Sequence, residues 1–271
     1  MMLSVKAKQE KPMVRKVSVK NNSSSKLPVW NDDGEAFSGQ DWEYGRTPRT
    51  TIPVGMVSGN ELVFVPEFAS IPTLPELLPT AVKAEITIGT NTTTVVKRWD
   101  EIENGFSAGI PVPAGTVDFF DVNENPIRIK WFVRYNPGAW RNAGESLHEI
   151  YFLRGMPQTD LRQETLYWLA CAGSARGKSK TEDLVNAIWS KFSTGSGPAN
   201  TTRKNGTLLT YWGQDWDTPM HQTVTAFLKD GDARCGIWAD FYCSVLQMQS
   251  IGAQVRVIIL DPIDSPSVMP Q

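Results

Sequence analysis

Cys235 has the setting of a nucleophile, in the segment GDARCGIWADFYCSVLQMQSIGAQVRV at residues 231–257. A loop leads to it and an amphipathic helix follows, whose apolar stripe is formed by Ile237, Phe241, Val245 and Met248. A cysteine at the start of a helix lies near unpaired backbone N–H groups and the positive end of the helix dipole. Both favour the thiolate, which is the nucleophilic form. Position alone would still favour a small buried hydrophobe, the usual setting of a free cysteine. The pattern of the residues around Cys235 leads us to predict a nucleophile instead.

A thiol nucleophile needs a base, and the sequence supplies none at the expected place. No histidine follows Cys235, and His221, which precedes it, is predicted to face solvent from the first turn of a helix. His148 belongs to a predicted strand, and we interpret it as structural. Because a base must come within hydrogen-bond reach of the thiol, we do not expect His221 to serve. Cys171 and Cys243 are expected to be core residues, as free cysteines usually are.

Two helices are predicted before this cysteine, one over residues 160–172 and one in which Leu184, Val185, Ile188, Trp189 and Phe192 have helical spacing. The second follows the capping box SKTE at residues 179–182. A short helix is predicted over residues 222–228, and a strand over residues 255–260.

Residues 160–261 resemble the transglutaminase-like branch of the papain-like cysteine enzymes. The resemblance rests on the two leading helices, on the aromatic pair Tyr211-Trp212, and on the cysteine-bearing helix that runs into IGAQVRV. It implies that Cys235 attacks an amide or acyl carbonyl of a peptide or protein substrate. It also implies that Gly252 ends the helix in the left-handed conformation.

The aromatic segment before the cysteine has two interpretations. In the first, Tyr211, Trp212 and Gln214 donate to the oxyanion or form walls of the substrate cleft, as a side-chain donor does in related enzymes. In the second, Trp212 packs in the core beneath the cysteine helix.

The family places its histidine and aspartate on strands that follow the cysteine helix, but only the strand at residues 255–260 is predicted here. We therefore expect a C-terminally incomplete core, which is either a fragment or a natural pseudoenzyme. An unpaired sheet edge after one core strand favours the fragment. The function predicted is thiol acyl transfer or amide hydrolysis, of transglutaminase or peptidase type, inactive or impaired in this chain. The alternative is a non-catalytic binding or scaffold protein of the same fold.

The first half of the chain carries β signals. Strands are predicted on both sides of turns at residues 58–60 and 89–91. Residues 127–135 alternate between apolar and polar side chains, as a half-buried strand does, and residues 116–122 are its expected partner.

The fold class predicted is α+β, an N-terminal antiparallel β domain followed by the helical half of a papain-like, transglutaminase-like core. Residues 1–27 are predicted to be a disordered basic tail and residues 28–136 the β-rich domain. The transglutaminase-like core takes residues 137–261, and residues 262–271 form a polar tail.

A second motif, AGSARGKS at residues 172–179, matches a relaxed phosphate-binding loop. In a P-loop nucleotide-binding protein Gly177, Lys178 and Ser179 would hold the phosphates. However, Ala172 stands where the first glycine belongs, and the preceding residues predict a helix instead of the strand that aims such a loop.

Composition limits the remaining possibilities. A net charge of −2 gives no reason to expect nucleic acid or membrane partners, and no apolar run approaches a membrane span. Three cysteines and two histidines at unrelated positions predict neither a disulfide framework nor a metal site. We expect no cofactor and a cytoplasmic location.

Overall fold

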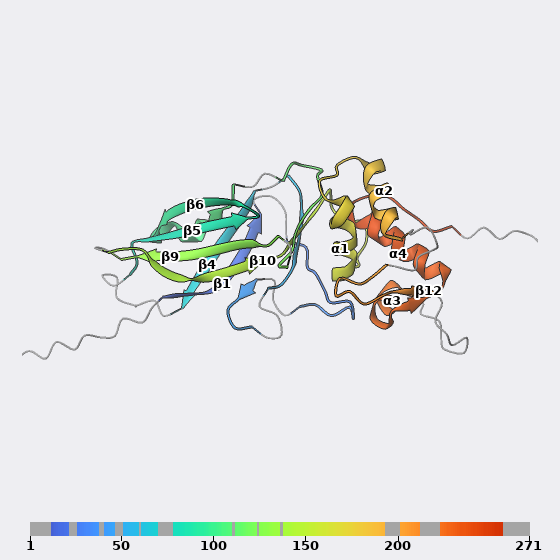
Figure 1. Ribbon diagram of the computed structural model, residues 1–271, viewed down its shortest axis with the longest axis horizontal. Coiled ribbons are helices and arrows are strands. Elements are labelled where there is room, and N and C mark those ends of the chain that lie inside the picture. The colour runs from blue at the N-terminus through green and yellow to red at the C-terminus, as the bar shows by residue number, and fades with distance from the viewer. Residues whose placement is uncertain are drawn as a thin grey trace, which may run out of the picture.

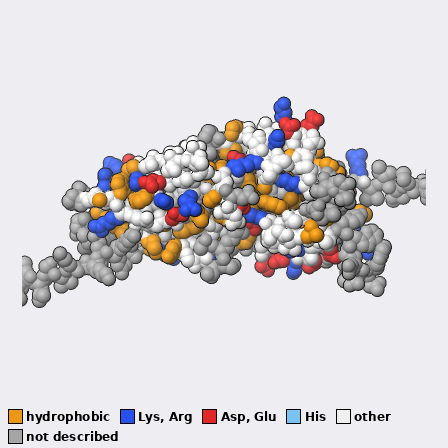
Figure 2. All heavy atoms as spheres, viewed as in Figure 1, with side chains coloured by type: hydrophobic (Ala, Val, Ile, Leu, Met, Phe, Trp, Pro, Cys, Tyr) orange, Lys and Arg blue, Asp and Glu red, His pale blue; other side chains and the backbone are white. Residues whose placement is uncertain are grey.

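The computed structural model describes residues 12–21, 26–37, 41–46, 51–59, 61–69, 78–109, 112–123, 125–135, 138–192, 201–211 and 223–256. Figure 1 shows two lobes side by side, one of strands and one of helices, so the predicted α+β class is confirmed. On the face in Figure 2, basic and acidic side chains are interspersed. No helix within the described ranges is long and apolar enough to cross a bilayer.

The strand-rich lobe consists of two four-stranded antiparallel sheets. One has the order β2 (Trp42–Glu43), β1 (Met13–Asn21), β4 (Leu62–Ala69) and β7 (Phe106–Ser107), and the other the order β10 (Arg141–His148), β9 (Ile127–Arg134), β5 (Ala81–Ile88) and β6 (Asn91–Arg98). A 3₁₀ turn, η2 (Trp99–Asn104), follows β6. The sheets share one apolar core, in which the rings of Phe106 and Trp131 meet edge to face at 5.3 Å.

A third sheet joins the two lobes. Its order is β3 (Val54–Val57), β11 (Ile150–Leu153) and β8 (Asp118–Phe120), with β3 parallel and β8 antiparallel to β11. Successive side chains of a strand point to opposite faces. Accordingly, Ile150 and Phe152 belong to the core of the strand-rich lobe, whereas Tyr151 and Leu153 belong to the helical core.

Two strand predictions hold in detail. The alternation over β9 is observed, since Ile127, Ile129, Trp131 and Val133 are all fully buried. β5 and β6 form the predicted hairpin, and Gly89 takes a φ of +55° in its turn.

Two predicted pairings are wrong. β3 and β4 flank the turn at residues 58–60 but lie in different sheets, because β3 pairs with β11 and β4 with β1. Residues 116–122 do not pair with β9, which lies between β10 and β5, while β8 pairs with β11. Alternation identifies the buried face of a strand. The partner strand is selected by packing between segments that are far apart in the sequence.

The prediction of a disordered tail at residues 1–27 is wrong for the part that the structure describes. β1 pairs with β4 from Met13 to Asn21, and Val14, Val17 and Val19 are buried. The register shifts between Val14 and Lys16, which marks a β-bulge. The bulge breaks strict alternation, so the local pattern did not indicate a strand.

The helical lobe contains α1 (Glu164–Cys171), α2 (Thr181–Phe192), α3 (Val224–Asp230) and α4 (Cys235–Met248), with a 3₁₀ turn, η3 (Gly173–Ala175), after α1. It also contains β12 (Thr210–Tyr211) and β13 (Asp232–Ala233). α1 begins four residues later than the predicted start at residue 160, because the backbone before it bonds to Trp30 instead. The Trp30 N–H donates to the Arg162 carbonyl oxygen, and the Glu164 N–H donates to the Trp30 carbonyl oxygen.

The predicted boundary between a tail at residues 1–27 and a β-rich domain from residue 28 is also not observed. Leu27 and Val29 are buried in the helical core, although the strands that follow them build the other lobe. The Tyr167 hydroxyl of α1 donates to the Pro28 carbonyl oxygen over 3.1 Å. This early segment therefore holds the helical lobe to the sheets.

The end of α4 differs from the prediction. The left-handed residue is Ser250, with φ +59°, and Gly252 has no positive φ. The Ile251 N–H bonds to the Leu246 carbonyl oxygen and the Ser250 N–H to that of Gln247, which is a Schellman motif. The strand predicted over residues 255–260 is not present at residues 255 and 256, and residues 257–260, with the predicted tail at 262–271, lie outside the described residues.

Candidate functional site

Cys235 is the first residue of α4, and its side chain is exposed. Arg234, the N-cap residue, makes no side-chain capping bond, since a guanidinium has no acceptor. The Trp238 N–H bonds to the Arg234 carbonyl oxygen at 3.1 Å, so the Cys235 N–H precedes the intrahelical ladder. That N–H can meet a negative oxygen that develops on a carbonyl attacked by the thiol.

Aromatic packing holds the start of α4 in place. Trp238, one turn after Cys235, is buried with its ring 4.8 Å from that of Phe227 in α3. Phe241 lies 5.2 Å from Phe227 and 5.3 Å from Phe192 of α2. Because these rings fix the first two turns of α4, Cys235 projects from a rigid element.

A short parallel pairing brings β12 beside the approach to Cys235. β12 pairs with β13, which places Tyr211 opposite Ala233, two residues before the cysteine. The indole N–H of Trp238 also donates to the Thr210 carbonyl oxygen over 3.3 Å. The aromatic segment singled out in the sequence therefore has its backbone next to the N-terminus of α4.

Tyr211, Trp212 and Gln214 were predicted for this site, and His221 was predicted to lie away from it. Trp212, Gln214 and His221 lie outside the described residues, and the structure describes Tyr211 by its backbone alone. The roles assigned to them from the sequence stay predictions.

The other two cysteines have settings that differ from that of Cys235. Cys171 is fully buried, its thiol bonds to the Phe152 carbonyl oxygen, and burial raises its pKa to about 12. Cys243 is half-buried and borders a hollow of about 470 Å³ along α4, and both burial and the nearby Asp240 raise its pKa. Neither is placed at a helix N-terminus.

His148 lies in β10, as predicted, and serves the core of the strand-rich lobe. Its Nε2 is 2.9 Å from the Ser146 hydroxyl, and its ring is 4.9 Å from that of Phe64. Burial lowers the pKa of His148 to about 3, with a smaller contribution from Lys26. His148 is therefore neutral and enclosed, which fits the structural role that we predicted for it.

The phosphate-binding interpretation of residues 172–179 lacks its structural context. The loop follows α1, a helix, where a phosphate-binding loop requires a strand. The Gly177 N–H donates to the Val117 carbonyl oxygen at 2.7 Å, and the Val117 N–H donates to that of Lys178. Lys178 and Ser179 are exposed, so these residues form an inter-helix turn docked on the sheet.

A buried charged cluster, which the sequence did not indicate, lies where the lobes meet. The ammonium of Lys204 pairs with Glu149, with Glu164 at 2.9 Å, and with Asp121 at 3.4 Å. The Tyr151 hydroxyl donates to Glu149 as well. These residues are far apart in the chain, so no local spacing could have revealed them.

Comparison of the chain with protein-family models, with curated proteins and with solved structures gave no significant match.

Proposed function

We propose that this protein is a thiol-dependent acyl-transfer or amide-hydrolysing protein of the transglutaminase-like type, with Cys235 as its nucleophile. The observation that carries the proposal is the exposed thiol at the N-terminal residue of α4. The pairing of β12 with β13, which brings the backbone of Tyr211 opposite Ala233, supports the proposal.

The chemistry proposed has two steps. The Cys235 sulfur attacks the carbonyl carbon of a primary amide and a thioester forms. The amide nitrogen takes up the thiol proton, the C–N bond breaks, and ammonia leaves. Water then yields a carboxylic acid, or a primary amine yields a new amide, and the thiol is restored. The backbone N–H of Cys235 stabilises the oxyanion in the first step.

A second candidate is a non-catalytic binding protein that keeps the same fold. It is supported by the histidines: His148, the one histidine that the structure describes, is enclosed in the other lobe. Without a base, an exposed thiol reacts with activated electrophiles but turns over unactivated amides slowly.

Ammonia release from a glutamine-containing peptide distinguishes the two candidates. For the enzyme we expect release that Cys235→Ser abolishes and Cys243→Ser, the matched control on the same helix, retains. For the binding protein, the peptide binds but ammonia release from the unaltered chain equals that from Cys235→Ser.

A further inference from the structure

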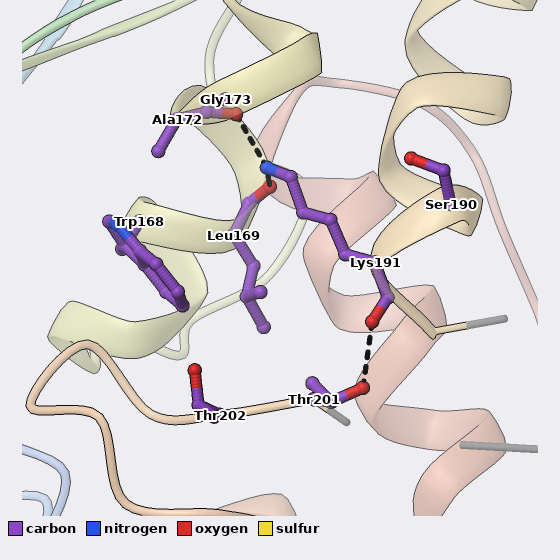
Figure 3. A pocket seen from close by; sticks show the side chains of 8 residues that line it. All are labelled: Trp168, Leu169, Ala172, Gly173, Ser190, Lys191, Thr201 and Thr202. Atoms are coloured by element: carbon purple, nitrogen blue, oxygen red, sulfur yellow. Dashed lines mark hydrogen bonds between the residues drawn. The ribbon is translucent and has the colours of Figure 1, made fainter. Parts of the chain in front are cut away.

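A cavity of about 260 Å³ lies between the C-terminal turn of α1, the end of α2 and residues 201–202 (Figure 3). Its lining consists of Trp168, Leu169, Ala172, Gly173, Ser190, Lys191, Thr201 and Thr202. Trp168 and Leu169 supply apolar surface from α1, and Thr202 lies opposite them. The Thr201 hydroxyl donates to the Lys191 carbonyl oxygen over 2.9 Å. Cys235 is not part of this lining. A ligand bound in this cavity would therefore be independent of the proposed acyl transfer.

Lys191 brings a positive charge to the cavity wall. Its Nζ donates to the carbonyl oxygens of Leu169, at 2.5 Å, and of Ala172, at 2.6 Å (Figure 3). These carbonyls belong to the last turn of α1, where a cation interacts favourably with the helix dipole. An ammonium has three N–H donors, so one remains after these two bonds.

The charge of Lys191 has no anionic partner among the residues that the structure describes. Burial lowers its pKa from 10.5 to about 8, and the group beside it that opposes this shift is the buried thiol of Cys171. A pKa of about 8 leaves the amine mostly protonated at pH 7. Lys191 therefore lines the cavity as a half-buried cation with one N–H donor beyond the two bonds to α1.

We propose that this cavity binds a small organic anion, a carboxylate on an apolar or aromatic body, with Lys191 as its counter-ion. The carboxylate accepts the remaining N–H of Lys191 in a charge-assisted hydrogen bond. Its apolar body packs on Trp168 and Leu169. Because pockets for drug-sized ligands measure about 300–1,000 Å³, this cavity suits a smaller molecule.

Titration calorimetry of the full chain at pH 7 tests the proposal, with benzoate as the probe. Benzyl alcohol serves as the uncharged control, and acetate as the control without an aromatic body. We expect benzoate to bind at least tenfold more tightly than either. Lys191→Met should weaken benzoate binding at least tenfold. Lys180→Met replaces an exposed lysine of the same lobe that does not line the cavity, and it should leave benzoate binding unchanged.

Because Lys191 also caps α1, a second variant separates binding from folding. Thr202→Phe fills the cavity from the opposite wall and leaves the cap intact, so we expect an unchanged melting temperature and loss of benzoate binding. Three results would overturn the proposal: no binding of benzoate to the unaltered chain, equal binding of benzyl alcohol, or unchanged benzoate binding in both variants.

Discussion

The Nζ atom of Lys204 lies 2.9 Å from a carboxylate oxygen of Glu164, the first residue of α1. The same atom pairs with Glu149, which lies between β10 and β11, and with Asp121, which follows β8. One ammonium thus connects the segment 201–211, which includes β12, to α1 and to the sheet that joins the lobes. Burial lowers the pKa of Lys204, but the attraction of Glu149 and Glu164 outweighs it, so this pKa is raised.

Replacement of Lys204 by methionine should destabilise the protein strongly. It leaves three buried or nearly buried carboxylates without the shared cation, and breaking a buried charge pair costs about 3–5 kcal/mol. Urea unfolding at pH 7 measures the loss. The matched control is Lys180→Met, at an exposed position, which should change the free energy of unfolding by less than about 0.5 kcal/mol. Equal effects of the two substitutions would contradict the role of Lys204.

Val17→Asp should unfold or severely weaken the strand-rich lobe. Val17 is fully buried in β1, and an isolated charge there loses its water without a partner. Lys20→Asp changes an exposed residue of the same strand and should be tolerated. Thermal unfolding and limited proteolysis report the difference. If Val17→Asp melted like the unaltered chain, β1 would not belong to the core.

His148 should make the protein less stable in acid. Its folded pKa is about 3 against about 6.5 when unfolded, so between these values the unfolded chain binds a proton that the folded chain does not. Stability from this residue is complete above pH 6.5 and falls as pH decreases, by about 3 kcal/mol at pH 4.5. Urea unfolding of the unaltered chain and of His148→Gln, each at pH 6.5 and at pH 4.5, isolates the contribution of His148 to the free energy of unfolding. A drop of equal size in both proteins would exclude His148 as its source.

Two glycine substitutions should act in opposite directions. A Cβ atom at Gly55 in β3 would lie 2.5 Å from a ring carbon of Tyr167, so Gly55→Ala overpacks the contact between β3 and α1 and should cost about 1–3 kcal/mol. At Gly236 in α4 a Cβ atom meets nothing within 4 Å. Gly236→Ala should therefore be neutral or stabilise the helix by up to about 1 kcal/mol. The melting temperatures of the two variants measure these effects. A lower melting temperature for Gly236→Ala would contradict the open space around Gly236 at the start of α4.

Elements with a strong local period were predictable from the sequence. β9 shows its alternation over residues 127–134, α2 contains the residues whose helical spacing predicted it, and α4 begins at Cys235. Each of these signals comes from neighbouring residues, and the structure retains it.

Pairing and the position of β1 were not predictable in this way. The bulge after Val14 breaks the period of β1, and its partner β4 lies some fifty residues further along the chain. β3 and β11 pair across a still longer separation. Such contacts are selected by the packing of whole sheets.

The candidate site also has one part that local sequence predicts and another that only distant contacts produce. The loop-to-helix transition at Cys235 is local, so the sequence located the thiol at the helix N-terminus. The Lys204 cluster and the contact of Lys191 with α1 join residues from separate elements, and they became visible only in the folded chain.

The central claim is that Cys235 forms a thioester, and an activated ester tests it without the need for a base. The chain is mixed with p-nitrophenyl acetate, nitrophenolate release is recorded, and the acetylated residue is identified by peptide mass spectrometry. We predict a burst stoichiometric with the chain and acetyl on Cys235, absent in Cys235→Ser and retained in Cys243→Ser. Acetylation of Cys243 as fast as that of Cys235, or no acetyl on Cys235, would contradict the claim.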